Sequence, residues 1–134
     1  MSQVWDPLRK KMVALTPEEK VRQWFIGVLR DSLGVPSHMM MSEASLKFGD
    51  KPFRADIVVY GRDLSPLMVV ECKREDVQLD RTVLEQALKY NLVLGVEYIV
   101  ITNGHRTFCF KRTEDETVPF ERAESLPDWE TLRK

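Results

Sequence analysis

The fold is decided by two apolar runs, Ala55-Asp56-Ile57-Val58-Val59 and Val69-Val70-Glu71-Cys72-Lys73. Both runs are rich in β-branched residues and predict strands, which a turn at Gly61-Arg62-Asp63 joins into an antiparallel pair. Charged residues interrupt each run, and an isolated buried carboxylate is costly unless something compensates its charge. The same two runs therefore indicate where a functional site lies.

Further strands are predicted on either side of this pair in the sequence. A weaker alternation from Met39 to Phe48, with a turn at Gly49-Asp50, extends the pair to an antiparallel meander. The apolar run Tyr98–Thr102 predicts a buried strand, and Asn103-Gly104 predicts a hairpin into a strand at Thr107–Lys111.

A first amphipathic helix is predicted from Pro17 to Leu33. Thr16 can cap it and Glu19 can complete a capping box. Its apolar residues recur at helical spacing, and we expect them to face the core: Val21, Trp24, Phe25, Val28 and Leu29.

A second helix is predicted to begin at Asp80 or Thr82 and to end at Gly95. It is long enough for a right-handed crossover, which sets the strands before and after it parallel. The expected fold class is α/β, a mixed β-sheet flanked by helices in the order α-β-β-β-α-β-β.

Length and composition predict one domain over residues 1–134, because the 134 residues are 43% hydrophobic and 31% charged. We expect its core at about residues 16–112, followed by an acidic tail at 113–134 with a short helix around Pro127–Leu132. No apolar run approaches the roughly 18 residues of a membrane span, and no secretory signal is present, so a cytoplasmic location is expected. The two cysteines, Cys72 and Cys109, fall inside predicted strands and are expected to be buried free thiols.

The chemistry depends on Asp56, Glu71 and Lys73. Side chains alternate along a strand, so Glu71 and Lys73 share one face, and strand pairing brings Asp56 near Glu71. Mg²⁺, or Mn²⁺ in its place, is a hard cation that binds one or two carboxylates, and the backbone carbonyl of Cys72 can be a further ligand. Lys73 would orient or deprotonate an attacking water in phosphodiester hydrolysis.

Gln86 and Tyr90 form a second candidate pair. They are four residues apart on the second predicted helix and lie on one face of it, where an amide and a phenol can hydrogen-bond a phosphate, a base or a water. The simpler alternatives stay open for both features. Glu-x-Lys on a strand is often a solvated face, and Tyr90 can be a half-buried residue of the helix.

Several motifs in order resemble a known family. The runs Pro17–Gln23, Phe53–Tyr60, Val69–Arg74, Gln86–Tyr90 and Thr102–Gly104 look like the N-terminal nuclease domain of type I restriction enzyme R subunits. That domain belongs to the PD-(D/E)xK superfamily and has a restriction-endonuclease-like fold. The resemblance covers roughly residues 16 to 112.

The resemblance implies a role for each matching residue. Asp56 and Glu71 would be the metal ligands, Lys73 the catalytic lysine, and Gln86 with Tyr90 the QxxxY element. An acid from the first helix often completes such sites, and Glu18 and Glu19 are candidates here, as is Glu43, although a structural salt bridge is the simpler role for Glu43.

Two features differ from the full pattern. Ala55 stands where the superfamily has a proline before the first aspartate. The chain also lacks a Gly-x-x-x-x-Gly-Lys-Ser/Thr phosphate loop, so an ATP-driven motor would have to come from another protein.

The leading hypothesis is a magnesium-dependent nuclease that hydrolyses DNA, of the restriction or DNA-processing type, with DNA and restriction or helicase/translocase proteins as partners. Net charge −1 and pI ≈ 6.1 give no overall attraction for a polyanion, so nucleic-acid binding would have to be local, metal-assisted or shared with a partner. One alternative is a catalytically silent module that binds nucleic acid or a protein. Another is a structural domain with a buried ion pair at Lys73.

Overall fold

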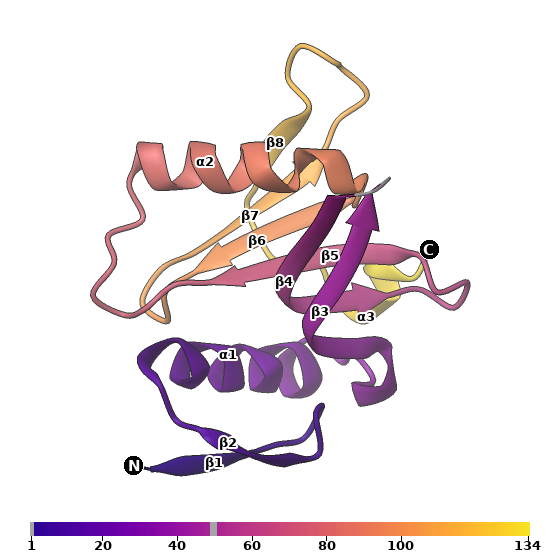
Figure 1. Ribbon diagram of the computed structural model, residues 1–134. Coiled ribbons are helices and arrows are strands. Elements are labelled where there is room, and N and C mark those ends of the chain that lie inside the picture. The colour runs from indigo at the N-terminus through magenta and orange to yellow at the C-terminus, as the bar shows by residue number, and fades with distance from the viewer. Residues whose placement is uncertain (1, 49–50) are drawn as a thin grey trace.

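The computed structural model of the protein describes residues 2–48 and 51–134, so the turn predicted at Gly49-Asp50 lies outside the described residues. In the described part, six strands form one sheet in the order β3-β4-β5-β6-β7-β8, with a helix on each face (Figure 1). Neighbouring strands are antiparallel except β5 and β6, which are parallel. The predicted mixed sheet is confirmed. The strands are β3 (Met40–Phe48), β4 (Lys51–Tyr60), β5 (Pro66–Cys72), β6 (Tyr98–Thr102), β7 (Thr107–Arg112) and β8 (Phe120–Ala123).

Helix α1 (Pro17–Gly27) covers one face of the sheet and continues as a π-helical turn at Val28–Ser32. Thr16 caps the helix, because its hydroxyl accepts the backbone N–H of Glu19 at 3.1 Å. The expected capping box is absent, since the N–H of Thr16 donates to the carbonyl of Ala14 and the Glu19 carboxylate binds other residues.

Helix α2 (Arg81–Asn91) covers the opposite face and continues as a 3₁₀ turn, η3, at Leu92–Leu94. Asp80 is its cap, with a side-chain oxygen 3.0 Å from the N–H of Val83. Gly95 ends the segment at φ 69°, a left-handed conformation that a glycine adopts without strain.

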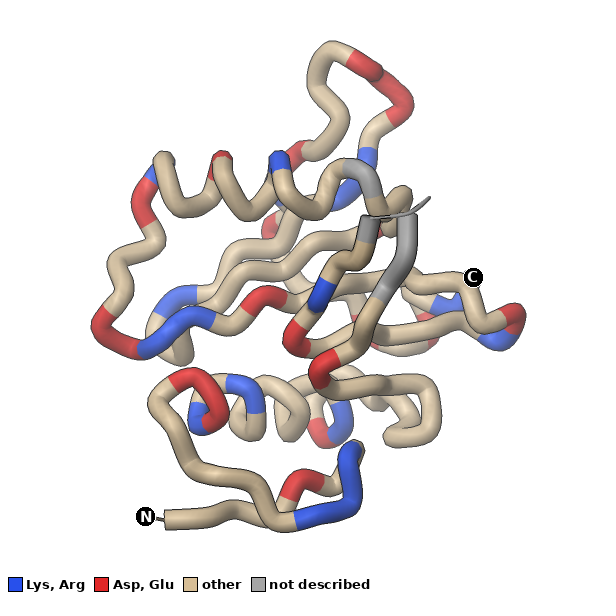
Figure 2. Tube along the Cα trace, in the orientation of Figure 1, with Lys and Arg blue, Asp and Glu red and all other residues tan. Residues whose placement is uncertain are grey.

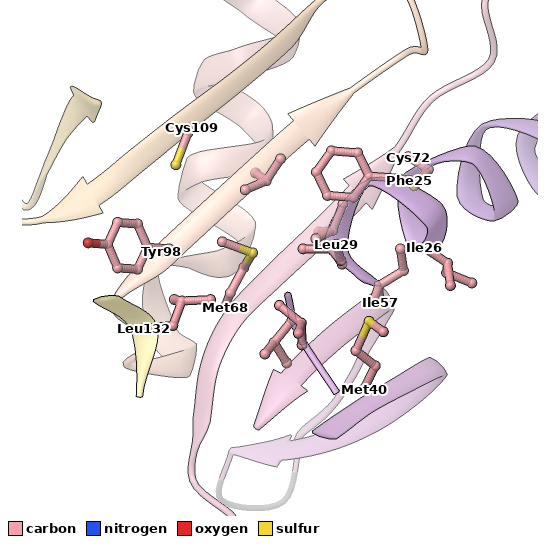
Figure 3. Close-up of a cluster of buried hydrophobic side chains, with 14 of the residues drawn as sticks. Phe25, Ile26, Leu29, Met40, Ile57, Met68, Cys72, Tyr98, Cys109 and Leu132 are labelled. Carbon is pink, nitrogen blue, oxygen red and sulfur yellow. The ribbon is translucent and has the colours of Figure 1, made fainter. Parts of the chain in front are cut away.

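The two helices enclose two apolar cores, one on each face of the sheet. Every residue of β6 is buried, because both faces of this strand are covered. Full burial of a large apolar side chain contributes about 1.5–3 kcal/mol, so these contacts hold both helices to the sheet. Figure 3 shows the core beneath α1, which includes Phe25, Ile26, Leu29, Met40, Ile57, Met68, Cys72, Tyr98, Cys109 and Leu132.

Additional elements lie before and after the predicted α-β-β-β-α-β-β order. A hairpin of β1 (Gln3–Asp6) and β2 (Lys11–Ala14) lies on the outer side of α1 (Figure 1). At the other end of the chain, β8 extends the sheet and the expected final helix is α3 (Trp129–Leu132). The N–H of Trp129 donates to the carbonyl of Leu33 at 2.8 Å, which holds α3 at the end of the π-helical turn. Among the described helices, none has the length and apolar character that crossing a bilayer requires.

Candidate active site

At Asp56, the side chains of strand β4 switch from one face of the sheet to the other. Ile57 packs in the core beneath α1, whereas Ala55 packs in the core beneath α2, although residues two apart on a regular strand share a face. Glu43, which the β3–β4 register leaves unpaired between Ser42–Ile57 and Ala44–Ala55, has φ 51°. This left-handed conformation is unusual for a residue with a side chain and indicates local strain. The irregularity places Asp56 at a bend of the hairpin.

The carboxylate of Asp56 lies in the gap between β4 and β5. Its Oδ2 accepts the backbone N–H of Cys72 at 2.7 Å, and its Oδ1 accepts Nη2 of Arg22 at 3.1 Å. The N–H and C=O of one residue leave the same edge of a strand, so the carbonyl oxygen of Cys72 faces this gap too. Asp56 thus occupies the place where a backbone partner on β4 would otherwise pair with Cys72.

Glu71 and Lys73 lie at the end of β5, on the side of the sheet that α2 covers. The Glu71 carboxylate is 3.3 Å from the Lys73 ammonium, and both side chains are partly exposed. The N–H of Lys73 donates to the carbonyl of Thr102 at 2.8 Å, so β6 fixes the backbone at this position. The β4–β5 register pairs Ile57 with Val70. Continuing this register by one residue sets Glu71 opposite Asp56.

A cavity of about 420 Å³ separates the end of β5 from α2 and includes Glu71, Lys73, Gln86 and Tyr90 in its lining. The Tyr90 hydroxyl accepts the N–H of Arg54 at 3.4 Å, and the Tyr90 ring lies 5.1 Å from the ring of Phe53. The structure therefore brings together four of the five predicted catalytic residues around one cavity. Asp56 lies in the gap between the strands and binds Arg22 of α1, outside the residues that line this cavity.

A network of acids and arginines connects Asp56 to α1 and to the N-terminal hairpin. Arg22 is its centre, because this buried guanidinium contacts Glu19 at 2.9 Å, Glu43 at 3.4 Å and Asp56 at 3.1 Å. Figure 2 shows acidic positions on β3 and β4 above α1, and acidic and basic positions together at the end of β5. We call this the acid–arginine network; its members are Asp6, Arg9, Glu19, Arg22, Glu43 and Asp56.

The network distinguishes the three acids considered as completing the site. Glu19 is only 5% exposed and reaches Asp56 through Arg22. Glu43 also contacts Arg22 and, more weakly, Arg54 at 3.8 Å, as expected for a structural salt bridge. Glu18 is exposed and forms no ion pair among the residues that the structure describes. Of the two acids on the helix, Glu19 is therefore the one that is linked to Asp56, through their shared contact with Arg22.

Arg9 and Arg22 are the site residues that sequence reasoning missed. Arg9 lies in the hairpin turn, and its guanidinium binds Asp6 and also Glu19, the latter at 2.6 Å. Burial alone would raise the pKa of Asp6, but hydrogen bonds from Arg9 and from the N–H of Leu8 lower it overall. Arg22 had a weak signal: it follows Glu19 by three residues and is adjacent to the core residue Val21.

Both cysteines are buried free thiols, as predicted. Burial raises the pKa of the Cys72 thiol well above its ordinary value, and the negative charge of Asp56 raises it further. Burial raises the pKa of Cys109 to about 11. Both thiols stay protonated near neutral pH, so Cys72 offers the site its backbone and no nucleophilic sulfur.

The oxygen atoms at this site are of the chemical kind that a hard divalent cation binds. Each carboxylate oxygen has two lone-pair sites, and the hydrogen bonds from Arg22 and Cys72 use one on each oxygen of Asp56. Over residues 2–48 and 51–134, no group of three or more His, Cys, Asp and Glu side chains is placed to hold a metal. A site with two carboxylates, one backbone oxygen and water matches the way proteins bind Mg²⁺.

The mixed sheet with a helix on each face is a restriction-endonuclease-like fold. The chain belongs to the family described as type I restriction enzyme R protein N terminus, whose model matches residues 17–127. No curated protein sequence matched the chain.

Two solved structures are similar to this one. A fragment described as an HsdR subunit of a type I restriction enzyme from Vibrio vulnificus has a TM-score of 0.61 and 23% identity, over 90% of this chain and 25% of that one. The chain thus spans a quarter of the length of that relative. A protein from Anabaena variabilis described as a nuclease has a TM-score of 0.55 and 13% identity, over 98% of this chain and 83% of that one. At these identities, the two likenesses concern the fold.

Proposed function

We propose that the chain is a metal-dependent nuclease of the PD-(D/E)xK type that hydrolyses phosphodiester bonds of DNA. One observation carries the proposal: the Asp56 carboxylate lies in the β4–β5 gap at the N–H of Cys72, while Glu71 and Lys73 at the same end of β5 line an open cavity. Membership of the restriction enzyme family supports a role of this kind.

Each residue has a distinct part in the proposed reaction. Asp56, Glu71 and the Cys72 carbonyl would hold Mg²⁺ or Mn²⁺, which supplies a Lewis acid that polarises the phosphodiester. Lys73 orients the attacking water and stabilises negative charge on the phosphoryl oxygens. Gln86 and Tyr90, on the α2 wall of the cavity, position the DNA strand. Arg22 holds the Asp56 carboxylate in the gap.

The test is cleavage of plasmid and oligonucleotide DNA with Mg²⁺ or Mn²⁺. Glu71→Ala and Lys73→Ala are each expected to reduce the rate by about 100-fold or more, as removal of one transition-state contact does elsewhere. Arg62→Ala is the matched control, because Arg62 is exposed in the turn at the far end of β4 and β5. Thermal melts confirm that the variants fold. Activity retained in both site variants would refute the assigned roles.

A second function is favoured by the partners of Asp56. Both of its oxygens already have a hydrogen-bond donor, and the Arg22 guanidinium compensates its charge without any metal. A module that binds DNA or a protein without catalysis would have the same arrangement. It predicts no cleavage with either metal ion, and binding that Asp56→Asn leaves unchanged.

We also propose that DNA translocation, if the reaction needs it, comes from partner proteins of a restriction system. The support is indirect: the chain matches only a quarter of the Vibrio vulnificus fragment, and its own sequence has no phosphate loop. Cleavage by the chain alone, with and without ATP, tests this. Stimulation by ATP in the purified chain would contradict it.

A further inference from the structure

Two arginines share one aromatic ring on the α2 side of the sheet. The guanidinium carbon of Arg106 lies 4.9 Å from the centre of the Phe108 ring, and that of Arg122 lies 4.7 Å from the same centre. Arg106 follows the β6–β7 turn and Arg122 belongs to β8, so two separate segments bring their charges to one place. Both side chains are exposed, whereas Phe108 is 6% exposed and fixed in the core.

These two guanidinium groups have no other partner in the described part of the chain. Neither forms an ion pair or donates a hydrogen bond there, and Glu124, which shares a surface hollow with Arg122, is not paired with it. Arg112 is different: it lies 5.6 Å from the Phe120 ring, but its Nε also donates to the carbonyl of Val96 at 3.1 Å. Arg112 is therefore a structural arginine, while Arg106 and Arg122 keep their donors for a ligand.

The arginine pair lies on the same face of the sheet as the cavity. Glu71 pairs with Ile101, and Ile101 pairs with Phe108, so these residues form one row across β5, β6 and β7. Directly paired residues point to the same side, and neighbouring strands are about 4.8 Å apart, so Phe108 lies about 10 Å from Glu71 along this row.

We propose that Arg106 and Arg122 form a phosphate-binding subsite that holds the DNA backbone beside the active site; the assignment of DNA as the ligand rests on the proposed function. A guanidinium presents a planar fork of donors that fits phosphate oxygens, and contact with an aromatic face fixes its plane and leaves its edge free. The separation of about 10 Å is short enough for this subsite to hold a phosphate close to the bond that is cut.

The net charge of the chain favours such a local site. At −1 the chain has no overall attraction for DNA, so the affinity has to come from places where positive charge is concentrated and unpaired. Other arginines near the cavity are already paired, such as Arg74 with Asp76 and Arg81 with Glu85. The Arg106–Arg122 pair meets the requirement.

The experiment measures the binding of a fluorescein-labelled single-stranded oligonucleotide, and of its duplex, in EDTA over a range of salt concentrations. The double variant Arg106→Ala/Arg122→Ala is expected to bind about tenfold or more weakly. Its slope of log K against log salt should be smaller by about 0.7 for each single-strand phosphate contact that is lost. Arg62→Ala/Lys134→Ala is the matched control, since it removes the same charge at the opposite end of the strands (Figure 1).

A second variant separates the shape of the guanidinium from its charge. Arg106→Lys/Arg122→Lys keeps both charges but loses the planar fork, so it should keep the salt slope and bind with intermediate affinity. The proposal is overturned if the double alanine variant binds like the wild type, if the control weakens binding equally, or if the folded wild type does not bind DNA.

Binding in EDTA also separates this proposal from the nuclease assignment. A chain that loses affinity on removal of the two arginines but cuts no DNA with any metal supports the subsite and refutes the nuclease. A chain that cuts DNA while the double variant binds normally refutes the subsite alone. Thermal melts of each variant confirm that Phe108 and its surroundings remain folded.

Discussion

The two acids of the candidate site lie in contrasting surroundings. Asp56 is fixed by Arg22 and by the backbone of Cys72, in a network that includes α1 and the N-terminal hairpin. Glu71 contacts Lys73 and otherwise faces an open cavity. The comparison shows that one side of the site is positioned by the fold before anything binds, whereas the other is left open for a ligand. Four measurements can break or sharpen this comparison.

The largest effect is expected for Arg22→Ala. The change leaves the buried carboxylate of Glu19 with less compensation and frees Asp56, and breaking a buried ion pair typically costs about 3–5 kcal/mol. The free energy of unfolding from denaturant titration measures this. Arg30→Ala is the control, because the pair of Arg30 with Asp31 is exposed, and its removal should leave stability unchanged. A loss below about 1 kcal/mol for Arg22→Ala would mean that the fold does not fix Asp56 through this network.

The second effect is stabilisation by the metal. A cation that binds only the folded form at 100 times its Kd adds about 2.7 kcal/mol, so Mn²⁺ should raise the melting temperature of the wild type. Asp56→Asn should abolish the shift, because it removes one of the two carboxylates. Glu130→Gln in α3 removes the same charge away from the site and should keep the shift. An equal shift in Asp56→Asn and the wild type would place the ion elsewhere.

The third effect concerns the open side of the site. Tyr90→Ala should lower kcat/KM on DNA about tenfold, since stacking on an aromatic ring contributes about 1–3 kcal/mol per base. Its stability should fall by only about 0.5–1.5 kcal/mol, through the lost contact with Phe53. Tyr90→Phe separates the hydroxyl from the ring, and Val118→Ala in an exposed loop is the control. A stability loss as large as that of Arg22→Ala would show that Tyr90 is mainly structural.

The smallest effect is a pH dependence at Asp6. The pKa of Asp6 is lower in the folded protein than its ordinary value of 3.8. Its contribution to stability is therefore complete above the unfolded-state pKa and is lost as the pH falls through the lower folded-state pKa. Melting temperatures of the wild type and Asp6→Asn should differ by a constant amount from pH 7 to about 5 and converge below about pH 4. Curves that stay parallel into acid would contradict the role of the Arg9 contact.

The elements predicted correctly from sequence are those whose stability is local or arises from simple burial. β4, β5 and β6 contain runs of β-branched residues with apolar neighbours on both faces, and the crossover through α2 sets β5 and β6 parallel. Asp56, Glu71 and Lys73 stood out because they are charged residues within or at the end of the otherwise apolar runs of β4 and β5. Of the residues predicted from their spacing and from the four-residue spacing of Gln86 and Tyr90, the structure places Glu71, Lys73, Gln86 and Tyr90 around one cavity. Asp56 lies in the β4–β5 gap, and the catalytic roles stay a prediction.

The features that were not predicted depend on contacts between distant segments. The β1–β2 hairpin has little apolar alternation from which its strands could be predicted. Ion pairs of Arg9 with Asp6 and Glu19 help to hold it instead. Trp24 was expected in the core but is 46% exposed, while Arg22, a charged residue, is buried beneath the same helix. The change of face at Asp56 accompanies the left-handed conformation of Glu43 on the neighbouring strand, and no period-two pattern on β4 reveals it.

The middle residue of Glu71-Cys72-Lys73 serves two unrelated requirements. The side chain of Cys72 points into the core beneath α1, while its peptide group lies against Asp56 on the strand edge. The core constrains the side chain at position 72 through its volume and hydrophobicity, whereas the gap constrains only the peptide group. Replacing the thiol with another small apolar side chain would therefore leave the peptide atoms that face the β4–β5 gap unaltered.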